Sequence, residues 1–176
     1  MHLKTLFNRC SKFKSFVFDR ADFQKTNGVD SLLITLKPRK NGGACCSICT
    51  KPQPIYDHQS DYRLFRFVPL WRIPVYLRYK MRRVDCPTDG VRVEQIPWAR
   101  GKSPLTHAME LFLARWARRL SWQEVSRCFD VSWDSVYRSV QSVVEYGLKH
   151  RSLNGVQAIG VDEIQYGKGH QYMTVV

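Results

Sequence analysis

The sequence predicts an α+β protein, in which a small β-rich module is followed by three helices and then by a β hairpin. Between residues 62 and 96, apolar and polar side chains alternate as they do along half-buried strands. After Pro97 the apolar residues recur at helical spacing. A short apolar run at 158–161 then ends in two carboxylates, and residues 172–176 begin another strand.

Charge gives the first indication of a partner. The chain of 176 residues carries 28 basic and 15 acidic side chains, a formal net charge of +13, and 44% of its residues are hydrophobic. This apolar content excludes a disordered polar tail. Between Lys37 and Arg83 there are eleven Lys and Arg against Asp57 and Asp61, a local charge of +9. Such clustering favours a nucleic acid partner over a merely basic protein.

Composition also bears on location. The chain has no run of eighteen apolar residues, which predicts no membrane span. Charged residues interrupt the first twenty positions, so no signal peptide is predicted and we expect a cytoplasmic protein. In that reducing compartment the six cysteines are expected to be thiols or metal ligands rather than disulfides.

Residues 31–98 are predicted to form the β module, whereas residues 1–30 receive no assignment, although their phenylalanines indicate that a short helix or strand packs there. The expected strands are Leu32–Leu36, Tyr62–Val68, Ile73–Val84 and Val91–Glu94. Asn41-Gly42-Gly43 is a turn that leads into the first cysteines.

A structural zinc site is predicted where two tight turns each offer two ligands. The four expected ligands are Cys46, Cys49, Cys86 and Asp89. Tetrahedral zinc needs four ligands, and the CxxC spacing of the first pair is repeated by the second pair at the far end of the module. Cys45 or His58 is an alternative fourth ligand. The other interpretation is an inert site, in which Cys86 is a small buried apolar residue.

Four basic residues of the strand 73–84 are candidates for contacts with DNA. They are Arg78, Lys80, Arg82 and Arg83. Because they gather at one strand end, we expect them to lie along phosphates. The alternative is an ordinary solvated strand surface.

Residues 102–148 are predicted to form a helix-turn-helix domain of three helices. The first spans Thr106–Arg119, and the capping box Ser121-Trp122-Gln123-Glu124 opens the second. Asp130 takes the turn position that often needs a left-handed backbone. Ser132 is expected to cap the third helix and Gly147 to end it. The expected core is Val125, Phe129, Val131, Val136 and Val140.

The outward side of the third helix is predicted to contact DNA. Its candidate residues are Ser132, Trp133, Tyr137, Arg138 and Gln141. Arg138 and Gln141 carry donors for base edges or phosphates, and Ser132 at the helix N-terminus can meet a phosphate. Trp133 and Tyr137 have a second interpretation, packing against the preceding helix. Three-helix units also serve as protein-interaction modules, but the surrounding arginines favour DNA.

Asp162 and Glu163 end the apolar run at 158–161. Two-metal phosphoryl-transfer enzymes hold magnesium with carboxylates at such strand ends. One aspartate cannot form that site, and a strand-end aspartate is commonly a turn former.

Taken together, these segments resemble the insertion-sequence transposases of the ISL-three family. The matching stretches are Cys46–Cys49, Arg82–Pro87, Val93–Ala99, Phe112–Ala117, Leu120–Trp122, Ile159–Ile164 and Gly169-His170. The resemblance runs from about residue 30 to the end, and the order and spacing of the motifs make it specific.

The resemblance implies a bacterial protein with a zinc ribbon, a helix-turn-helix and then a ribonuclease-H-like domain that carries a magnesium-dependent Asp-Asp-Glu triad. It assigns Asp162 to the first acid and residues 157–176 to the start of that domain, which we expect to be truncated. Only a complete member would then use magnesium, and we expect this chain to be inactive alone. Asp89 stands where the family usually has a fourth cysteine.

The expected partner is double-stranded DNA at the terminal inverted repeats of an insertion sequence. A second copy or a full-length transposase is a further expected partner, and no membrane is expected. The alternatives are a stand-alone DNA-binding regulator, an inhibitor of the full transposase, or a nonfunctional remnant.

Overall fold

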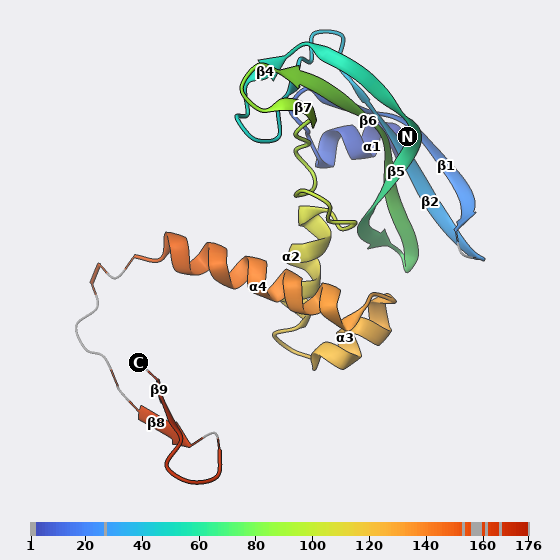
Figure 1. Cartoon of the computed structure of the whole chain (residues 1–176). Coiled ribbons are helices and arrows are strands. Elements are labelled where there is room, and N and C mark those ends of the chain that lie inside the picture. The colour runs from blue at the N-terminus through green and yellow to red at the C-terminus, as the bar shows by residue number, and fades with distance from the viewer. Residues whose placement is uncertain are drawn as a thin grey trace. The chain divides into compact units, whose positions relative to one another are not determined.

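The structure is a computed structural model that describes residues 3–26, 28–152, 154–155, 160, 162–165 and 167–175. The chain divides into two compact units, Met1–Val143 and Val144–Val176. The fold is α+β with mixed sheets, as the sequence predicts (Figure 1). The β module and the N-terminal part of the helix Trp133–His150 both belong to the first unit.

The first unit is built on a sheet in the order β1-β2-β6-β5. Its strands are β1 (Phe16–Thr26), β2 (Val29–Pro38), β5 (Ile55–Leu70), β6 (Ile73–Cys86) and β7 (Gly90–Val93). Neighbouring strands are antiparallel except β2 and β6, which run parallel over four residue pairs. Beyond that stretch, β7 pairs with the C-terminal end of β6. The predicted strands are present, and β5 is longer than expected at both ends.

The N-terminal residues complete this sheet. Helix α1 (Leu3–Cys10) packs its buried Phe7 on Phe18 of β1, with ring centroids 5.6 Å apart. β1 pairs with β2 from Phe16 to Thr26. The residues that the sequence analysis left unassigned therefore belong with the β module.

An aromatic cluster forms the centre of the β core. Trp98, 1% exposed, lies against the rings of four residues at centroid distances of 4.8 to 6.0 Å. These are Phe13, Phe16, Phe65 and Tyr79. Three of the four contacts are edge-to-face, an arrangement in which the positive edge of one ring meets the negative face of the other. Trp98 follows β7, the last strand of this sheet along the chain. The segment that leads from the sheet to the helices therefore packs on the sheet through Trp98.

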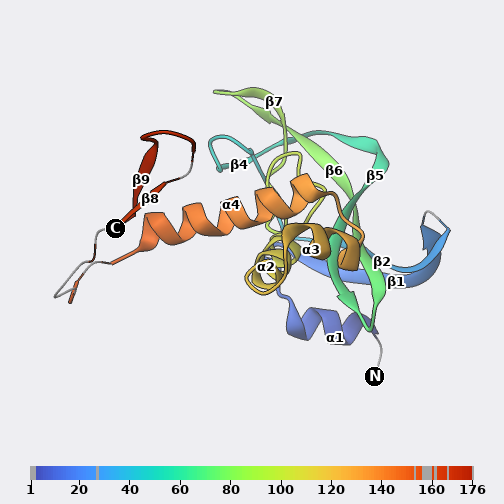
Figure 2. The ribbon, with the colours of Figure 1, turned by 90° about the horizontal axis from the view of Figure 1, so that it is seen from below.

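Three helices follow the sheet. They are α2 (His107–Trp116), α3 (Trp122–Phe129) and α4 (Trp133–His150). Their apolar residues form a second core of Leu105, Met109, Leu113, Val125 and Val136, and Figure 2 shows α2 and α3 beside the first half of α4. None of the described helices has the length and apolar character that crossing a membrane requires.

The helix boundaries test the local predictions. The Ser121–Glu124 capping box is present, and Asp130 has φ 48°, in the left-handed region. Ser132 accepts a hydrogen bond from the Ser135 amide at 3.1 Å, as an N-cap does. The expected end at Gly147 is wrong, since α4 continues to His150. An internal glycine costs a helix only about 1 kcal/mol, which is too little to stop it.

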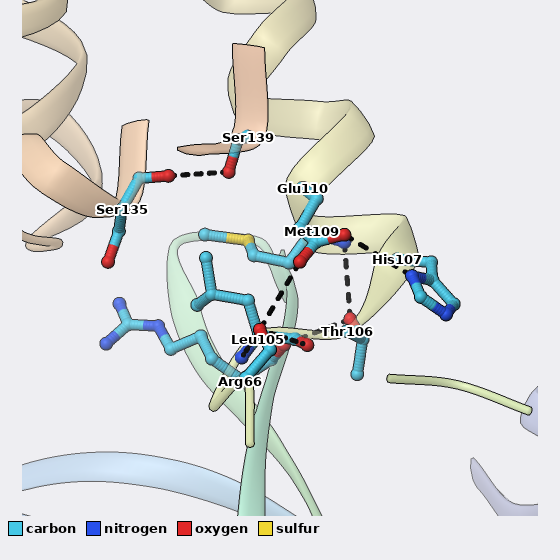
Figure 3. A network of polar contacts seen from close by, with 9 residues as sticks. Arg66, Leu105, Thr106, His107, Met109, Glu110, Ser135 and Ser139 are labelled. Carbon is cyan, nitrogen blue, oxygen red and sulfur yellow. Dashed lines mark hydrogen bonds and ion pairs between the residues drawn. The ribbon is translucent and has the colours of Figure 1, made fainter. Parts of the chain in front are cut away.

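One residue of β5 joins the sheet to the helices. The Arg66 carbonyl accepts hydrogen bonds from both the amide and the hydroxyl of Thr106, each at 3.0 Å (Figure 3). Thr106 also caps α2, where its hydroxyl accepts from the Met109 amide. The Arg66 guanidinium donates to the Phe129 carbonyl at the end of α3, at 2.9 Å. The start of α2 and the end of α3 are thus held by the same strand residue.

The second unit contains the C-terminal part of α4 and a hairpin of β8 (Asp162–Gln165) and β9 (Tyr172–Val175). The strands are antiparallel, with Asp162 opposite Val175. Residues 156–159 and 161, most of the run predicted to lead into Asp162, are outside the described residues.

Candidate metal centre and nucleic-acid interface

The first cysteine pair lies in a tight turn between β3 (Ala44–Cys45) and β4 (Pro52–Gln53). The turn is closed by a hydrogen bond from the Thr50 amide to the Cys46 carbonyl at 3.1 Å. Thr50 has φ 61°, a left-handed conformation that bends the chain back sharply. This turn directs the thiol of Cys46 and that of Cys49 to one place.

The second pair reaches that place from the turn between β6 and β7. The Cys49 and Cys86 sulfurs are 3.6 Å apart, and an Asp89 carboxylate oxygen lies 3.3 Å from both the Cys46 and the Cys86 sulfur. All four ligand atoms lie within 4.8 Å of one another. Cys46 and Cys86 are buried, beside Ala44 and Val84. The structure therefore brings together the four residues that the sequence predicted.

These distances fit a tetrahedral metal. Zinc–sulfur bonds of about 2.3 Å place two sulfurs roughly 3.8 Å apart, and a sulfur and a carboxylate oxygen roughly 3.5 Å apart. The observed separations of 3.3 to 3.6 Å are slightly shorter than these edges. A cluster of three thiols and one carboxylate can hold a metal ion of the zinc type.

Local hydrogen bonds shift the pKa values of this cluster in different directions. The Thr88 hydroxyl lowers the pKa of the Cys86 thiol, against the effect of burial. The Cys86 and Cys46 thiols donate to Asp89 and lower the pKa of its carboxyl group. At Cys46, the Ile48 amide favours the thiolate, but burial and the neighbouring Asp89 raise the pKa overall.

The alternative fourth ligands lie outside the cluster. Cys45 is in β3, and its carbonyl accepts a hydrogen bond from the Gln95 amide. His58 is exposed on β5 and pairs across the sheet with Arg82. In the described part of the chain, only Asp89 joins the three cysteines.

The basic residues of β6 have different environments. Lys80 is exposed and its ammonium lies 5.7 Å from the ring centre of Tyr62. Arg78 donates to the Thr35 hydroxyl at 2.7 Å, and Arg83 forms an ion pair with Asp57. The side chains of Arg78, Lys80 and Arg83 are all at least partly exposed to solvent.

Arg82 is a correction to the predicted set, because its side chain is only 5% exposed and is bound within the protein. Its guanidinium pairs with the buried Glu94 carboxylate at 2.6 Å, and the Tyr79 hydroxyl donates to the same carboxylate at 2.6 Å. Burial, with Glu94 beside it, raises the pKa of Tyr79. Arg82 therefore anchors the segment after β7 and is not available to a phosphate.

The aromatic residues at the start of α4 pack against α3, as one of their two interpretations predicts. Trp133 and Tyr137 stack at 5.8 Å with an interplanar angle of 7°, and both lie within 6 Å of the Trp122 ring on α3. They nevertheless remain 48% and 41% exposed. The packing fixes their rings and leaves an aromatic surface open to a partner.

Polar residues continue this surface along α4. Ser132, Arg138 and Gln141 are exposed. Arg138 pairs with Asp134 one turn away at 3.0 Å, with both side chains more than half exposed. Such a surface ion pair contributes little stability, so Arg138 can exchange Asp134 for another anion.

A group of arginines lies near the junction of α2 and α3. Arg115, Arg118 and Arg119 line a hollow of about 520 Å³. All three are exposed, and among the described residues none forms an ion pair with a carboxylate. Three uncompensated cations around one hollow favour an anionic ligand.

The comparisons with known proteins agree with this geometry. Residues 94–144 match the helix-turn-helix domain of transposase family ISL3. This match covers α2, α3 and the first part of α4. The similarity to ISL3-type transposases therefore includes the helices of the first unit.

Two relatives extend the similarity beyond the helices. It is 28% identical over 166 residues to the transposase for insertion sequence element IS1557 of Mycobacterium tuberculosis, covering 93% of this chain and 37% of that protein. It is 24% identical over 147 residues to the transposase for insertion sequence element IS1001 of Bordetella parapertussis, covering 83% of this chain and 36% of that protein. The chain thus spans little more than a third of these relatives. No solved structure matches it.

The sequence analysis missed two features of this chain. Arg66 was given no role, although it joins β5 to α2 and α3. Trp71, at the β5–β6 turn, is 80% exposed and was not considered as a contact. A large aromatic residue between two predicted strands is a signal that the sequence did contain.

Proposed function

We propose that this chain binds the terminal inverted repeats of an insertion sequence, with the N-terminal half of α4 in the major groove. The observation that carries this proposal is the ISL3 helix-turn-helix match over residues 94–144. In helix-turn-helix proteins the second helix of the motif contacts base edges with its N-terminal residues. Here that helix is α4, and the residues that the sequence selected at its N-terminal half are all exposed.

Each residue of this surface has a separate role in the proposal. Arg138 and Gln141 donate to base edges, while Ser132 lies at the helix N-terminus, where a phosphate is favoured. Trp133 and Tyr137 contact the sugar–phosphate backbone with their exposed ring surfaces. The hollow lined by Arg115, Arg118 and Arg119 takes a backbone phosphate. Arg78, Lys80 and Arg83 add sequence-independent attraction from the sheet.

The test is replacement of Arg138 by Ala. We expect binding to a duplex selected by the wild-type protein to weaken by about tenfold, because one base contact is worth about 1–3 kcal/mol. Gel-shift titration measures it. Arg9→Ala, on the exposed side of α1, removes the same charge and is expected to have little effect. Equal affinities for the wild type and Arg138→Ala contradict the assignment of this helix.

We also propose that Cys46, Cys49, Cys86 and Asp89 hold one structural zinc ion. Three soft thiolates with a carboxylate suit zinc better than magnesium or calcium. When bound, the ion would cross-link the turn after β3 to the turn after β6, which have only a small apolar cluster between them. Its role would be to keep the β module rigid.

Replacement of Asp89 tests the zinc proposal. Asp89→Cys should bind zinc more tightly than the wild type and Asp89→Ala more weakly, because thiolate is the stronger zinc ligand at a site of this kind. Competition with a chromophoric chelator measures the affinities, and elemental analysis should give close to one zinc per chain. The zinc proposal would be overturned if the folded wild-type protein contained no zinc, or if the three proteins bound zinc with equal affinity.

Asp162 is proposed to be the first carboxylate of a ribonuclease-H-like catalytic site. It is exposed at the start of β8. A two-metal site needs further carboxylates, and the only metal-ligand cluster among the described residues is the cysteine site. Asp162 alone therefore supports no reaction step.

A further inference from the structure

The tip of the β5–β6 hairpin presents an aromatic and a basic side chain together. Leu70 pairs with Ile73, which leaves Trp71 and Arg72 as the two turn residues. Trp71 is 80% exposed, more than any other large apolar side chain in the described part of the chain. Arg72 is exposed beside it and has no ion pair among the described residues.

The backbone of this turn is strained for the residues that occupy it. Trp71 has φ 48° and Arg72 has φ 68°. Two-residue hairpin turns with positive φ at both positions strongly favour Asn-Gly, Asp-Gly or Gly-Gly, because a bulky side chain opposes this conformation. A stability requirement alone would not select Trp-Arg here. Strain retained by exposed side chains indicates a function for those side chains.

The hairpin is fixed against the helix-turn-helix. Arg66 of β5 is bound through its backbone to Thr106 (Figure 3) and to Pro104. Its guanidinium donates to the Phe129 carbonyl. Its second guanidinium nitrogen donates to Tyr76 of β6 at 2.9 Å. Both hairpin strands therefore share a bonded network with the end of α3.

A hollow joins the hairpin tip to the turn of the motif. It has a volume of about 630 Å³, and its lining includes Arg66, Arg72, Phe129 and Asp130. Asp130 lies two residues before Ser132, the cap of α4. The tip thus lies beside the point where the chain enters the proposed recognition helix.

We propose that Trp71 and Arg72 form a second DNA contact, which grips the backbone and minor groove next to the groove that α4 occupies. This inference rests on the proposed DNA-binding function. An arginine is attracted by the negative potential of a narrow minor groove, and an exposed apolar ring can lie against sugars or wedge at a base step. Duplex DNA is the favoured occupant because both turn residues suit it and the first unit carries the whole net positive charge.

The test uses Trp71→Asn combined with Arg72→Gly. This pair removes both side chains and supplies the dipeptide that the turn prefers, so thermal unfolding should occur at an equal or higher temperature. On a duplex selected by the wild-type protein, we expect roughly tenfold weaker binding, from the loss of one aromatic contact and one cation. Hydroxyl-radical footprinting should lose protection at one flank, while methylation protection of major-groove guanines remains.

The outcomes are distinguishable. A stable double variant with unchanged affinity and footprint overturns this inference and leaves the proposed function intact. A wild-type protein that binds no duplex overturns both. If DNA binding is unchanged but sedimentation shows that the variant has lost self-association, the tip contacts protein and the inference is wrong. Arg9→Ala is the control for loss of charge, and Phe23→Ala, on β1, is the control for loss of an exposed ring.

Discussion

At the scale of single residues, neighbouring arginines on β6 differ in what their ion pairs contribute. Arg82 and Glu94 are 5% and 0% exposed in their side chains, whereas Arg83 and Asp57 are 43% and 38% exposed. Removing one partner of a buried pair leaves an uncompensated charge without water. An exposed pair is solvated in either state.

This contrast gives a prediction with a built-in control. Arg82→Met should lower the free energy of unfolding by about 3–5 kcal/mol, because Glu94 would keep a buried charge without its partner. Arg83→Met should lower it by about 1 kcal/mol or less. Urea denaturation followed by circular dichroism measures both. Similar losses for the two variants would contradict the structural role assigned to Arg82.

The sequence could predict the metal ligands but not the burial of Arg82, because the first depends on local spacing and the second on a distant partner. Cysteine spacing is local, so Cys46 and Cys49 identify their own turn. Alternation along β6 placed Arg82 with Arg78 and Lys80, yet its partner Glu94 is twelve residues away in the next segment. Only the tertiary fold determines that this carboxylate is buried beside it.

At the scale of elements, the turn between α3 and α4 depends on one left-handed residue. Asp130 has φ 48° and ψ 57° at the C-cap of α3. The left-handed conformation costs free energy in any residue that has a Cβ, although aspartate tolerates it better than most residues. The geometry of the helix-turn-helix therefore includes a small local cost.

Substitutions by Gly and Ala should separate backbone conformation from side-chain loss. At position 130, we expect Asp130→Gly to be more stable than Asp130→Ala by about 1 kcal/mol, because glycine adopts positive φ freely. At position 134, within α4, the order should reverse by about 1 kcal/mol, since alanine is the better helix former. Urea denaturation of the four variants measures the differences. The same order at both positions would show that the turn is not strained.

Elements with a clear period could be predicted, and those set by non-local pairing could not. The alternation of β6 and the capping box of α3 are local signals, and both are present. β1 carries polar residues along much of its length, so no apolar alternation marks it, and its partner β2 defines it as a strand. α4 passes Gly147 because its neighbours continue the helical hydrogen bonds.

At the scale of the whole molecule, charge is distributed unevenly between the two units. Residues 144–176 contain three basic and three acidic side chains, so the entire net charge of +13 lies within Met1–Val143. The same unit holds the cysteine cluster, the arginine hollow and the exposed residues in the N-terminal half of α4. A polyanion would therefore be attracted to the first unit as a whole, while individual contacts determine where it is held.

Salt dependence separates these two contributions to DNA binding. Each cation that displaces a counterion from duplex DNA adds about 0.9 to the slope of log affinity against log salt. Arg118→Ala, in the arginine hollow, should reduce that slope by about one and weaken binding to all sequences alike. Arg138→Ala should instead reduce the preference for the selected sequence over a mixed duplex. Fluorescence anisotropy across a salt series measures both quantities. An unchanged slope for Arg118→Ala would mean that no phosphate occupies the hollow, and a preference unaffected by Arg138→Ala would mean that α4 does not contact bases there.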